Sequence, residues 1–291
     1  MFNLCAQIFG FVLNFIYGIV NNYGLAIIIF TLILKLIMFP MSIKQQKTMK
    51  KSAKIQGKVK EIQDKYSNDP TRMNQEVMEL YKKENMSPFS GCLSSIFQFI
   101  VILSMFYLVS RPLTYMLKID QDTINNYVNE IKAESSESGE AIRYQEIAVI
   151  KKYAETDEKV NINMNFLGLN LSSIPSQDYK TDPKVCIIPV LYVITSIASM
   201  KITTALNSNK KAKEKAKDIK TKLPEKVDKP DDNAEMMEQM NRSMTWMMPI
   251  MTVSIACIAP LGLALYWFLS NLLSIGERLL VYKVFKTEEE E

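Results

Sequence analysis

The chain has 291 residues, 48% of them hydrophobic and 23% charged, and a formal net charge of +4. Its mean hydropathy is nearly zero because apolar and charged residues are segregated into separate blocks, a pattern that is typical of an integral membrane protein. Histidine is missing from the sequence, which excludes His-dependent catalytic triads, HExxH zinc sites and imidazole proton relays.

Residues 1–22 form an apolar segment with small or polar residues at regular spacing. These are Asn3, Gln7, Gly10, Asn14, Gly18 and Asn21. The spacing puts them on one narrow face of a helix, so we expect an amphipathic helix lying at the outer membrane interface. A sixth membrane span and an uncleaved signal-like segment are the alternatives.

The first long apolar run is residues 23–43, about the length that a helix needs to span a bilayer. Lys35 is its only charged residue and lies about 18 Å from the start of the run, at 1.5 Å per residue. A cation at that depth costs roughly 2.5–3.5 kcal/mol on insertion scales, so it is expected to face protein or water. Either the lysine snorkels to an interface or it occupies a functional polar cavity, and its position alone favours neither.

Residues 44–88 predict a cytoplasmic helical hairpin. Apolar residues recur at heptad spacing in two sets, Ile55, Val59, Ile62 and Tyr66, and then Met73, Val77 and Leu80. Asp69 or Asn68 is expected to cap the second helix, with Pro70 at its start. The hairpin is either a rigid spacer or a docking surface for a nascent chain, the ribosome or the translocon, since its basic flanks attract acidic partners and anionic lipids.

Four further apolar runs bring the predicted number of spans to five. They are residues 89–109, 185–200, 244–259 and 261–282. The second and third of these runs are short for a full span, which implies tilt or local thinning of the bilayer. Pro260, Leu261 and Gly262 predict a tight turn between the last two spans.

The charges of the connecting segments predict the orientation. Residues 44–88 contain 11 Lys and Arg against 6 Asp and Glu, residues 201–243 contain 11 against 8, and residues 110–184 contain 9 against 12. Basic segments stay in the cytoplasm. We therefore expect the N-terminus outside, an extracellular loop with short helices at 110–184, a mobile basic cytoplasmic loop at 201–243 and a cytoplasmic tail at 283–291.

Residues for catalysis or metal binding are scarce. The four cysteines, Cys5, Cys92, Cys186 and Cys257, lack paired spacing and are expected to be small buried side chains. We expect no metal, no cofactor and no enzymatic activity, with a Ser/Lys dyad at Lys35 as the remaining alternative. A nucleic-acid role for residues 201–243 is disfavoured against a solvated linker, because no aromatic residues are interleaved with the lysines.

Four stretches resemble the YidC-type membrane protein insertases, a family with mitochondrial and chloroplast relatives. They are residues 24–41 followed by Lys44–Lys47, residues 62–70, residues 85–92 leading to Gln98, and residues 262–271, which read GLALYWFLSN. With five spans in this order, the resemblance extends over most of the chain. The external loop and the second cytoplasmic loop match poorly.

The resemblance implies an all-α membrane protein in which five transmembrane helices surround a polar groove open to the cytoplasm and to lipid. In the family, a cation on the first span attracts acidic residues of the client's translocated tail. Lys35 occupies that position, where the family usually has arginine, and lysine is a point charge that loses its proton more readily. By the same matching, Thr31 and Gln98 add polar groups to this substrate-binding groove, and Trp267 lines the exit path with Tyr266 nearby.

The function implied by the resemblance is that of an insertase and chaperone in the bacterial plasma membrane. It moves short polar tails of client proteins through a hydrophilic half-channel and releases their apolar segments into lipid. Expected partners are newly made membrane proteins and membrane lipids, with the Sec translocon and the ribosome as candidates at residues 44–88 and 201–243, and the chain is expected to be a monomer. A small transporter or channel with a lone intramembrane lysine, and a non-catalytic membrane scaffold, are the alternatives.

Overall fold

The computed structural model describes residues 2–67, 69–85, 90–134, 144–218 and 254–288. This described part is mostly helical and includes one two-stranded sheet. Three of its helices are long and apolar enough to cross a membrane, at Phe2–Val20, Tyr23–Thr48 and Pro183–Ile202, and a shorter apolar stretch is Ile96–Ser110. The predicted span at 244–259 lies largely outside the described residues, where only 254–258 are seen as helix.

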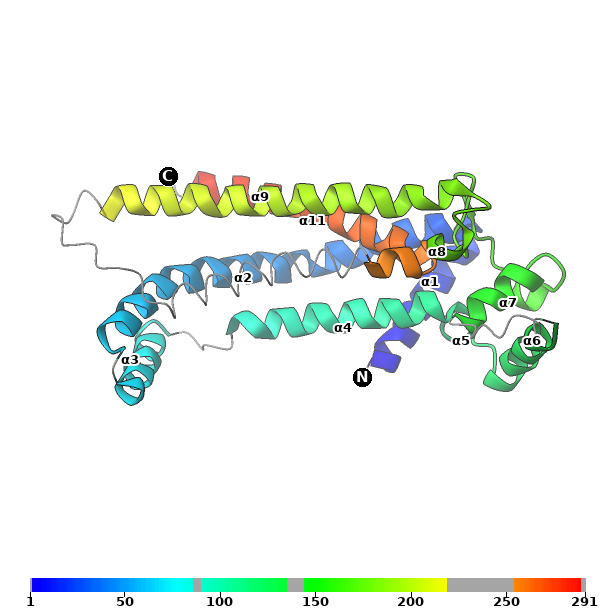
Figure 1. Cartoon of the computed structure of the whole chain (residues 1–291), viewed down its shortest axis with the longest axis horizontal. Helices are drawn as coiled ribbons and strands as arrows, with labels where there is room; N and C mark the ends of the chain where they lie inside the picture. Colours follow the sequence, from blue (N-terminus) through cyan, green and yellow to red (C-terminus); the bar gives the residue numbers. More distant parts are fainter. Residues whose placement is uncertain (1, 68, 86–89, 135–143, 219–253, 289–291) are drawn as a thin grey trace.

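Four long helices run along the longest axis of the molecule (Figure 1). They are α2 (Tyr23–Lys65), α4 (Ser90–Ser110), α9 (Ile187–Asp218) and α11 (Leu261–Glu288). Helix α11 packs against α9, α2 and α4, and α2 also contacts α4. The N-terminal helix α1 (Phe2–Val20) packs on α4 and α2 and runs obliquely to these helices (Figure 1).

Helix α2 is continuous from the apolar run into the basic hairpin. It begins at Asn22, whose side chain accepts a hydrogen bond from the backbone N–H of Leu25, and it continues through Pro40 for 43 residues. The helix is therefore not interrupted between residues 43 and 44, where the apolar run was expected to end. Hydropathy changes where the apolar run ends, but the lysine-, glutamine- and alanine-rich sequence that follows favours helix and extends the same hydrogen-bond ladder.

A second, short helix folds back against the end of α2. Helix α3 (Pro70–Lys83) follows Asp69, whose carboxylate accepts a hydrogen bond from the backbone N–H of Arg72, and Pro70 occupies the first turn. Lys58 of α2 pairs with Glu84 just after α3 at 2.6 Å. The side chain of Ile55 is buried where the two helices meet.

The helices that contain the third and fifth predicted spans extend beyond the apolar runs. A short 3₁₀ turn, η2 (Pro183–Cys186), leads directly into α9, so the apolar stretch is not short for a span. Helix α9 continues to Asp218, which corrects the prediction of a mobile loop for residues 201–218. Helix α11 likewise continues to Glu288, so most of the predicted tail extends the last helix.

Residues 112–134 and 144–186, here called the cap domain, lie at the end of the bundle opposite α3 (Figure 1). Its elements are α5 (Pro112–Tyr115), α6 (Gln121–Glu134), α7 (Gln145–Tyr153), η1 (Glu158–Val160), β1 (Asn165–Phe166), β2 (Leu169–Asn170), α8 (Pro175–Asp178) and η2. The strands pair antiparallel through a two-residue turn in which Leu167 and Gly168 both have positive φ, as a hairpin of this length requires. The Ser/Glu-rich stretch predicted as loop lies mainly at 135–143, outside the described residues.

The cap domain holds the beginnings of two long helices. The first N–H groups of a helix lack partners within the helix. Those of Leu261 and Gly262 in α11 donate to the carbonyl oxygens of Ser173 and Leu171, and that of Tyr23 in α2 donates to Asn163. The predicted turn at residues 260–262 is thus fixed by the cap domain rather than by local sequence alone.

The buried core is concentrated at the end of the bundle next to the cap domain. Helix α2 is densely buried from Tyr23 to Thr31, α4 from Val101 to Val109 and α11 from Leu261 to Tyr266. Among the described side chains of residues 32–48 in α2, none is buried. Among the described residues of the bundle, burial is therefore densest beside the cap domain and sparser towards α3.

Helix α1 has three distinct faces. Ala6, Gly10, Leu13 and Ile16 are buried, whereas Leu4, Ile8, Phe11, Phe15 and Ile19 form an exposed apolar face. Asn3, Gln7, Asn14 and Gly18 are exposed between these faces. Gly10 departs from the predicted polar stripe, because its position lies against the carbonyl of Tyr115, where a Cβ atom would come within 2.1 Å of the oxygen.

Candidate functional site

The side chain of Lys35 contacts helix α11. Its Nζ donates a hydrogen bond to Oγ of Ser274 in α11 at 2.6 Å and lies 3.9 Å from Oε2 of Glu277. The side chain retains 23% exposure, whereas the next residue, Leu36, is 73% exposed. Adjacent positions on a helix point in directions about 100° apart, so α2 turns its cation to α11 and its leucine outwards.

Helix α11 presents a row of polar side chains along one stripe. Asn271, Ser274 and Arg278 follow each other at spacings of three and four residues, which places them on the same face of the helix. Ser274 accepts from Lys35 and donates to the carbonyl of Ser270 at 2.7 Å, so its hydroxyl is used twice.

The same stripe also reaches α9. Nδ2 of Asn271 donates to Oγ of Ser196 at 3.0 Å and to Oγ1 of Thr195 at 3.4 Å. Seven residues further along α11, Nη1 of Arg278 donates to Oγ of Ser199 at 3.3 Å. We call the set Lys35, Thr195, Ser196, Ser199, Asn271, Ser274, Glu277 and Arg278 the polar seam, which joins α2, α11 and α9.

The remaining predicted groove residues occupy different settings. Thr31 is buried one turn before Lys35, and its hydroxyl donates to the carbonyl of Ile27 in its own helix. Tyr266 is buried in the core, and the half-buried Trp267 places its ring 6.3 Å from that of Tyr192 on α9. Gln98 is exposed on α4. The polar contacts of Lys35 are thus with α11, two to three turns beyond the two aromatic residues.

Glu277 and Arg278 were not among the predicted site residues. The carboxylate and the lysine that it approaches are 242 positions apart in the sequence, and no local motif connects them. One signal was present: a cation in an apolar helix requires compensation, and Glu277 is a carboxylate within the last predicted span. The third partner, Ser274, carries no such signal because serine is common in apolar helices.

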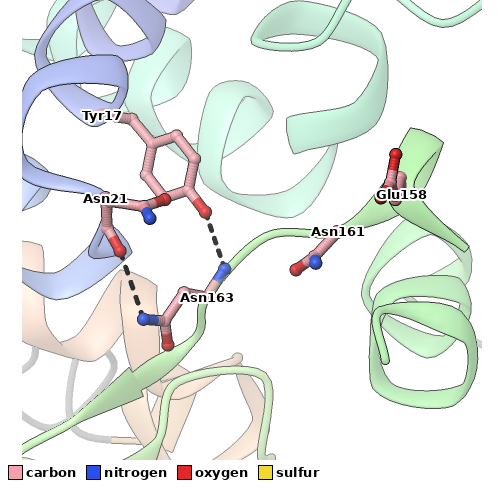
Figure 2. Close-up of a pocket in the computed structure, with 5 residues that line it drawn as sticks. All are labelled: Tyr17, Asn21, Glu158, Asn161 and Asn163. Carbon is pink, nitrogen blue, oxygen red and sulfur yellow. Dashed lines mark hydrogen bonds between the residues drawn. The ribbon is translucent and has the colours of Figure 1, made fainter. Parts of the chain in front are cut away.

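A separate polar pocket lies at the C-terminal end of α1. It measures about 500 Å³ and is lined by Tyr17, Asn21, Glu158, Asn161 and Asn163 (Figure 2). The backbone N–H of Asn163 donates to the Tyr17 hydroxyl at 2.8 Å, and its side-chain amide donates to the carbonyl of Asn21 at 3.2 Å. These bonds attach the end of α1 to the cap domain, so the pocket belongs to the junction between them.

The cap domain also contains a buried carboxylate, Glu146, which is 4% exposed. Its oxygens accept hydrogen bonds from the backbone N–H of Thr114 at 3.0 Å and from the Thr114 hydroxyl at 2.6 Å. Burial raises the pKa of Glu146, and the bonds from Thr114 and the nearby charge of Arg111 act in the opposite direction. The carboxylate thereby satisfies the first turn of α5.

Metal-binding groups are not apparent in the part of the chain that the structure describes. No cluster of three or more His, Cys, Asp or Glu side chains occurs among those residues. Cys5, Cys186 and Cys257 are free and half-buried rather than fully buried. The side chain of Cys92 lies outside the described part.

Long apolar helices and a cation held between two of them define an integral membrane protein. A protein-family model described as 60Kd inner membrane protein matches residues 15–289. The chain belongs to this family, which confirms the resemblance to YidC-type insertases. The family is one of the inner or plasma membrane. The family is non-enzymatic, in agreement with the expectation from the sequence.

Curated relatives carry the same family name. The "Membrane protein insertase YidC" of Rickettsia massiliae (strain Mtu5) is 35% identical over 123 residues, which cover 42% of this chain and 21% of the relative. That of Rickettsia prowazekii (strain Madrid E) is 43% identical over 96 residues, which cover 33% of this chain and 17% of the relative. The chain thus spans about a fifth of the length of the curated relatives that it matches.

Proposed function

We propose that this chain is a membrane protein insertase. It carries short polar tails of client proteins across the bilayer and releases their apolar segments into lipid. In this arrangement the five spans are the membrane parts of α2, α4 and α9, the run 244–259, and α11. The cap domain lies outside the cell, and α3 and the C-terminus lie in the cytoplasm, as the charge distribution of the connecting segments favours.

The contact between Lys35 and α11 is the observation that carries the proposal. A cation inside a membrane span is costly unless it faces protein or water, and such residues commonly mark a substrate pathway. Lys35 is held at 2.6 Å by a serine and lies near a carboxylate, yet it keeps 23% exposure. It is therefore both anchored and accessible to an acidic group entering from the side.

The uneven packing of the bundle supports a groove that opens towards the cytoplasm. Burial on α2 is dense up to Thr31 and absent among the described side chains of residues 32–48. Lys35 lies just beyond this boundary. A client tail entering from the cytoplasmic side would reach the lysine before it met the closed packing under the cap domain.

The energetics of the bilayer explain what such a groove accomplishes. A polar tail must otherwise cross about 30 Å of hydrocarbon, where each unsatisfied polar group costs several kcal/mol. A wet half-channel shortens that barrier, and the membrane potential acts on acidic residues in the tail. We assign Lys35 to the attraction of those residues, Thr31 and Gln98 to the polar wall, and Trp267 with Tyr266 to the exit path along α11 and α9.

Helix α1 is assigned to the outer interface rather than to a sixth span. An exposed row of Asn and Gln side chains lies beside an exposed row of Leu, Ile and Phe. This combination suits a helix at the boundary between water and lipid, where both faces find their preferred surroundings. Its oblique course relative to the long helices also favours this assignment (Figure 1).

Clients of this insertase are newly made membrane proteins. The cytoplasmic hairpin of α2 and α3 has basic residues at its flanks, which suit the ribosome, the translocon or anionic lipid as a docking partner. Trp267 and Glu277 lie ten residues apart on α11, so the proposed exit path and the carboxylate near Lys35 belong to the same helix.

The test uses the purified full chain in liposomes with a short single-span client that has an acidic external tail. We compare wild type with Lys35→Leu, Lys35→Arg and Lys35→Glu, and measure protection of the tail from added protease. Insertion is expected to be retained with Arg and reduced at least about tenfold with Leu and Glu, because only Arg keeps a cation near the tail.

Two results would contradict this account. Equal insertion by all four proteins above empty liposomes would mean that the charge of Lys35 is not used. Insertion by none of them above empty liposomes would remove the insertase function and favour transport or scaffolding.

A further inference from the structure

Glu277 gives Lys35 a counter-ion from within the protein. We propose that the Glu277 carboxylate pairs with Lys35 while the groove holds no client. An acidic residue of the client tail then displaces Glu277 from Lys35. The inference rests on the proposed function, and it identifies Glu277 as a residue that sets the specificity for acidic tails.

The two partners of Lys35 are bound in different ways. Ser274 accepts a hydrogen bond from the ammonium group at 2.6 Å, and this bond is short and direct. The Glu277 oxygen lies at 3.9 Å, which is an electrostatic contact beyond the range of a hydrogen bond. Ser274 can therefore stay in place while the carboxylate is exchanged.

Exchange of one carboxylate for another keeps an anion beside Lys35. The side chains of Lys35 and Glu277 are 23% and 14% exposed, so both charges are partly withdrawn from water. A partly desolvated cation without any anion is unfavourable, and Glu277 removes that penalty in the empty state. An incoming Asp or Glu then restores the same charge balance.

A displaced Glu277 has a second cation close by in the sequence. Arg278 is the next residue of α11, and its guanidinium is held against Ser199 of α9. Lys35 and Arg278 are thus the two cations of the polar seam, and Glu277 is its single carboxylate among the described residues. The seam therefore retains a net positive charge while Glu277 is paired.

This arrangement predicts a particular form of selectivity. A neutral tail gains nothing from Lys35, because it cannot replace Glu277. A tail with an acidic residue gains only the difference between its own contact and that of Glu277. The resident carboxylate therefore moderates the preference for acidic tails and favours release of the tail after insertion.

The test measures the ratio of two affinities in the full-length protein in nanodiscs. Two fluorescent single-span client peptides differ only in one tail residue, Asp or Asn, and their equilibrium binding is compared. In Glu277→Gln, which keeps the shape of the side chain, the affinity ratio of Asp to Asn peptide is expected to rise about fivefold, the scale of a partly exposed ion pair. In the double variant Lys35→Gln/Glu277→Gln the ratio is expected to be one.

Glu84→Gln is the matched control, because it removes the carboxylate that pairs with Lys58 in the hairpin and leaves the seam intact. It is expected to leave the ratio at the wild-type value. A Glu277→Gln variant that weakens both peptides equally, or leaves the ratio unchanged, would overturn the inference, since a purely structural glutamate has these effects.

Failure of the inference differs from failure of the proposed function. If wild type inserts clients above empty liposomes but Glu277→Gln leaves the ratio unchanged, only the role of Glu277 is wrong. If wild type itself inserts nothing, the proposed function is wrong and the inference is lost with it.

Discussion

Two carboxylates lie at opposite parts of this molecule and are held in different ways. Glu146 in the cap domain accepts hydrogen bonds at 3.0 and 2.6 Å from Thr114, and both of its oxygens are occupied. Glu277 in the bundle meets Lys35 only at 3.9 Å. A buried carboxylate with its hydrogen bonds satisfied fixes a fold, whereas one held by a longer electrostatic contact can be exchanged.

The surroundings of the two residues follow the same division. The cap domain ties down the first turns of α2 and α11 through backbone hydrogen bonds, and the core beside it is tightly buried. Around Lys35 the polar contacts between helices come from side chains, and several neighbouring apolar side chains of α2 are exposed. Among the described residues, one end of the bundle is tightly packed, and the other leaves more side chains exposed.

The largest expected difference between the two carboxylates is in the stability lost when each is replaced by alanine. Glu146→Ala leaves the N–H and hydroxyl of Thr114 without their partner, and we expect it to destabilise the cap domain by about 2–3 kcal/mol. Glu277→Ala should cost less than about 1 kcal/mol, because Lys35 keeps its bond to Ser274 and some contact with water. Hydrogen exchange of α5 and α7 amides in detergent micelles measures the first effect, and thermal unfolding measures both.

Equal destabilisation by the two alanine variants would break this comparison. It would mean that Glu277 is as firmly integrated in the fold as Glu146.

A smaller effect is expected from pH. The pKa of Glu146 is raised in the folded protein, so this group stabilises the cap domain most below its unfolded pKa, and the contribution is lost as pH rises through the folded pKa. The protection factors of α7 amides should therefore fall as pH rises from about 4 towards neutrality. Glu146→Gln should show a weaker fall, because glutamine does not titrate.

The difference in the pH dependence of the α7 protection factors between wild type and Glu146→Gln reports the titration of Glu146 alone. The pKa of Asp157 is lowered by a hydrogen bond from Tyr127, so its contribution to stability rises with pH. This contribution is the same in both proteins and cancels when their stabilities are subtracted. The same pH dependence in both proteins would show that the burial of Glu146 does not control the stability of the cap domain.

Much of the helical framework could be predicted from local sequence. The start and end of α4 differ from the prediction by one residue, and Asp69 caps α3 as expected. Both features depend on residues that are adjacent in the chain. The ends of α2, α9 and α11 were predicted less well, because hydropathy reports where an apolar run ends and these helices all continue into polar sequence.

The candidate site shows the same limit more sharply. Lys35 could be recognised from the sequence because a single cation in an apolar run is conspicuous. Its partners Ser274 and Glu277 are more than 230 positions away, and only the packing of α2 against α11 brings them together. The polar seam is a property of helix packing, which no local pattern encodes.

The most direct test of the central claim is a crosslink between the client tail and the neighbourhood of Lys35. A cysteine-free background carries Ser274→Cys, or Leu36→Cys as a control on the exposed face of α2, and the client carries one cysteine beside its tail Asp. We expect a disulfide with Ser274→Cys during insertion, a much weaker one with Leu36→Cys, and loss of the first when the tail Asp is replaced by Asn. Equal crosslinking at the two positions, regardless of the tail residue, would contradict a client tail held at Lys35.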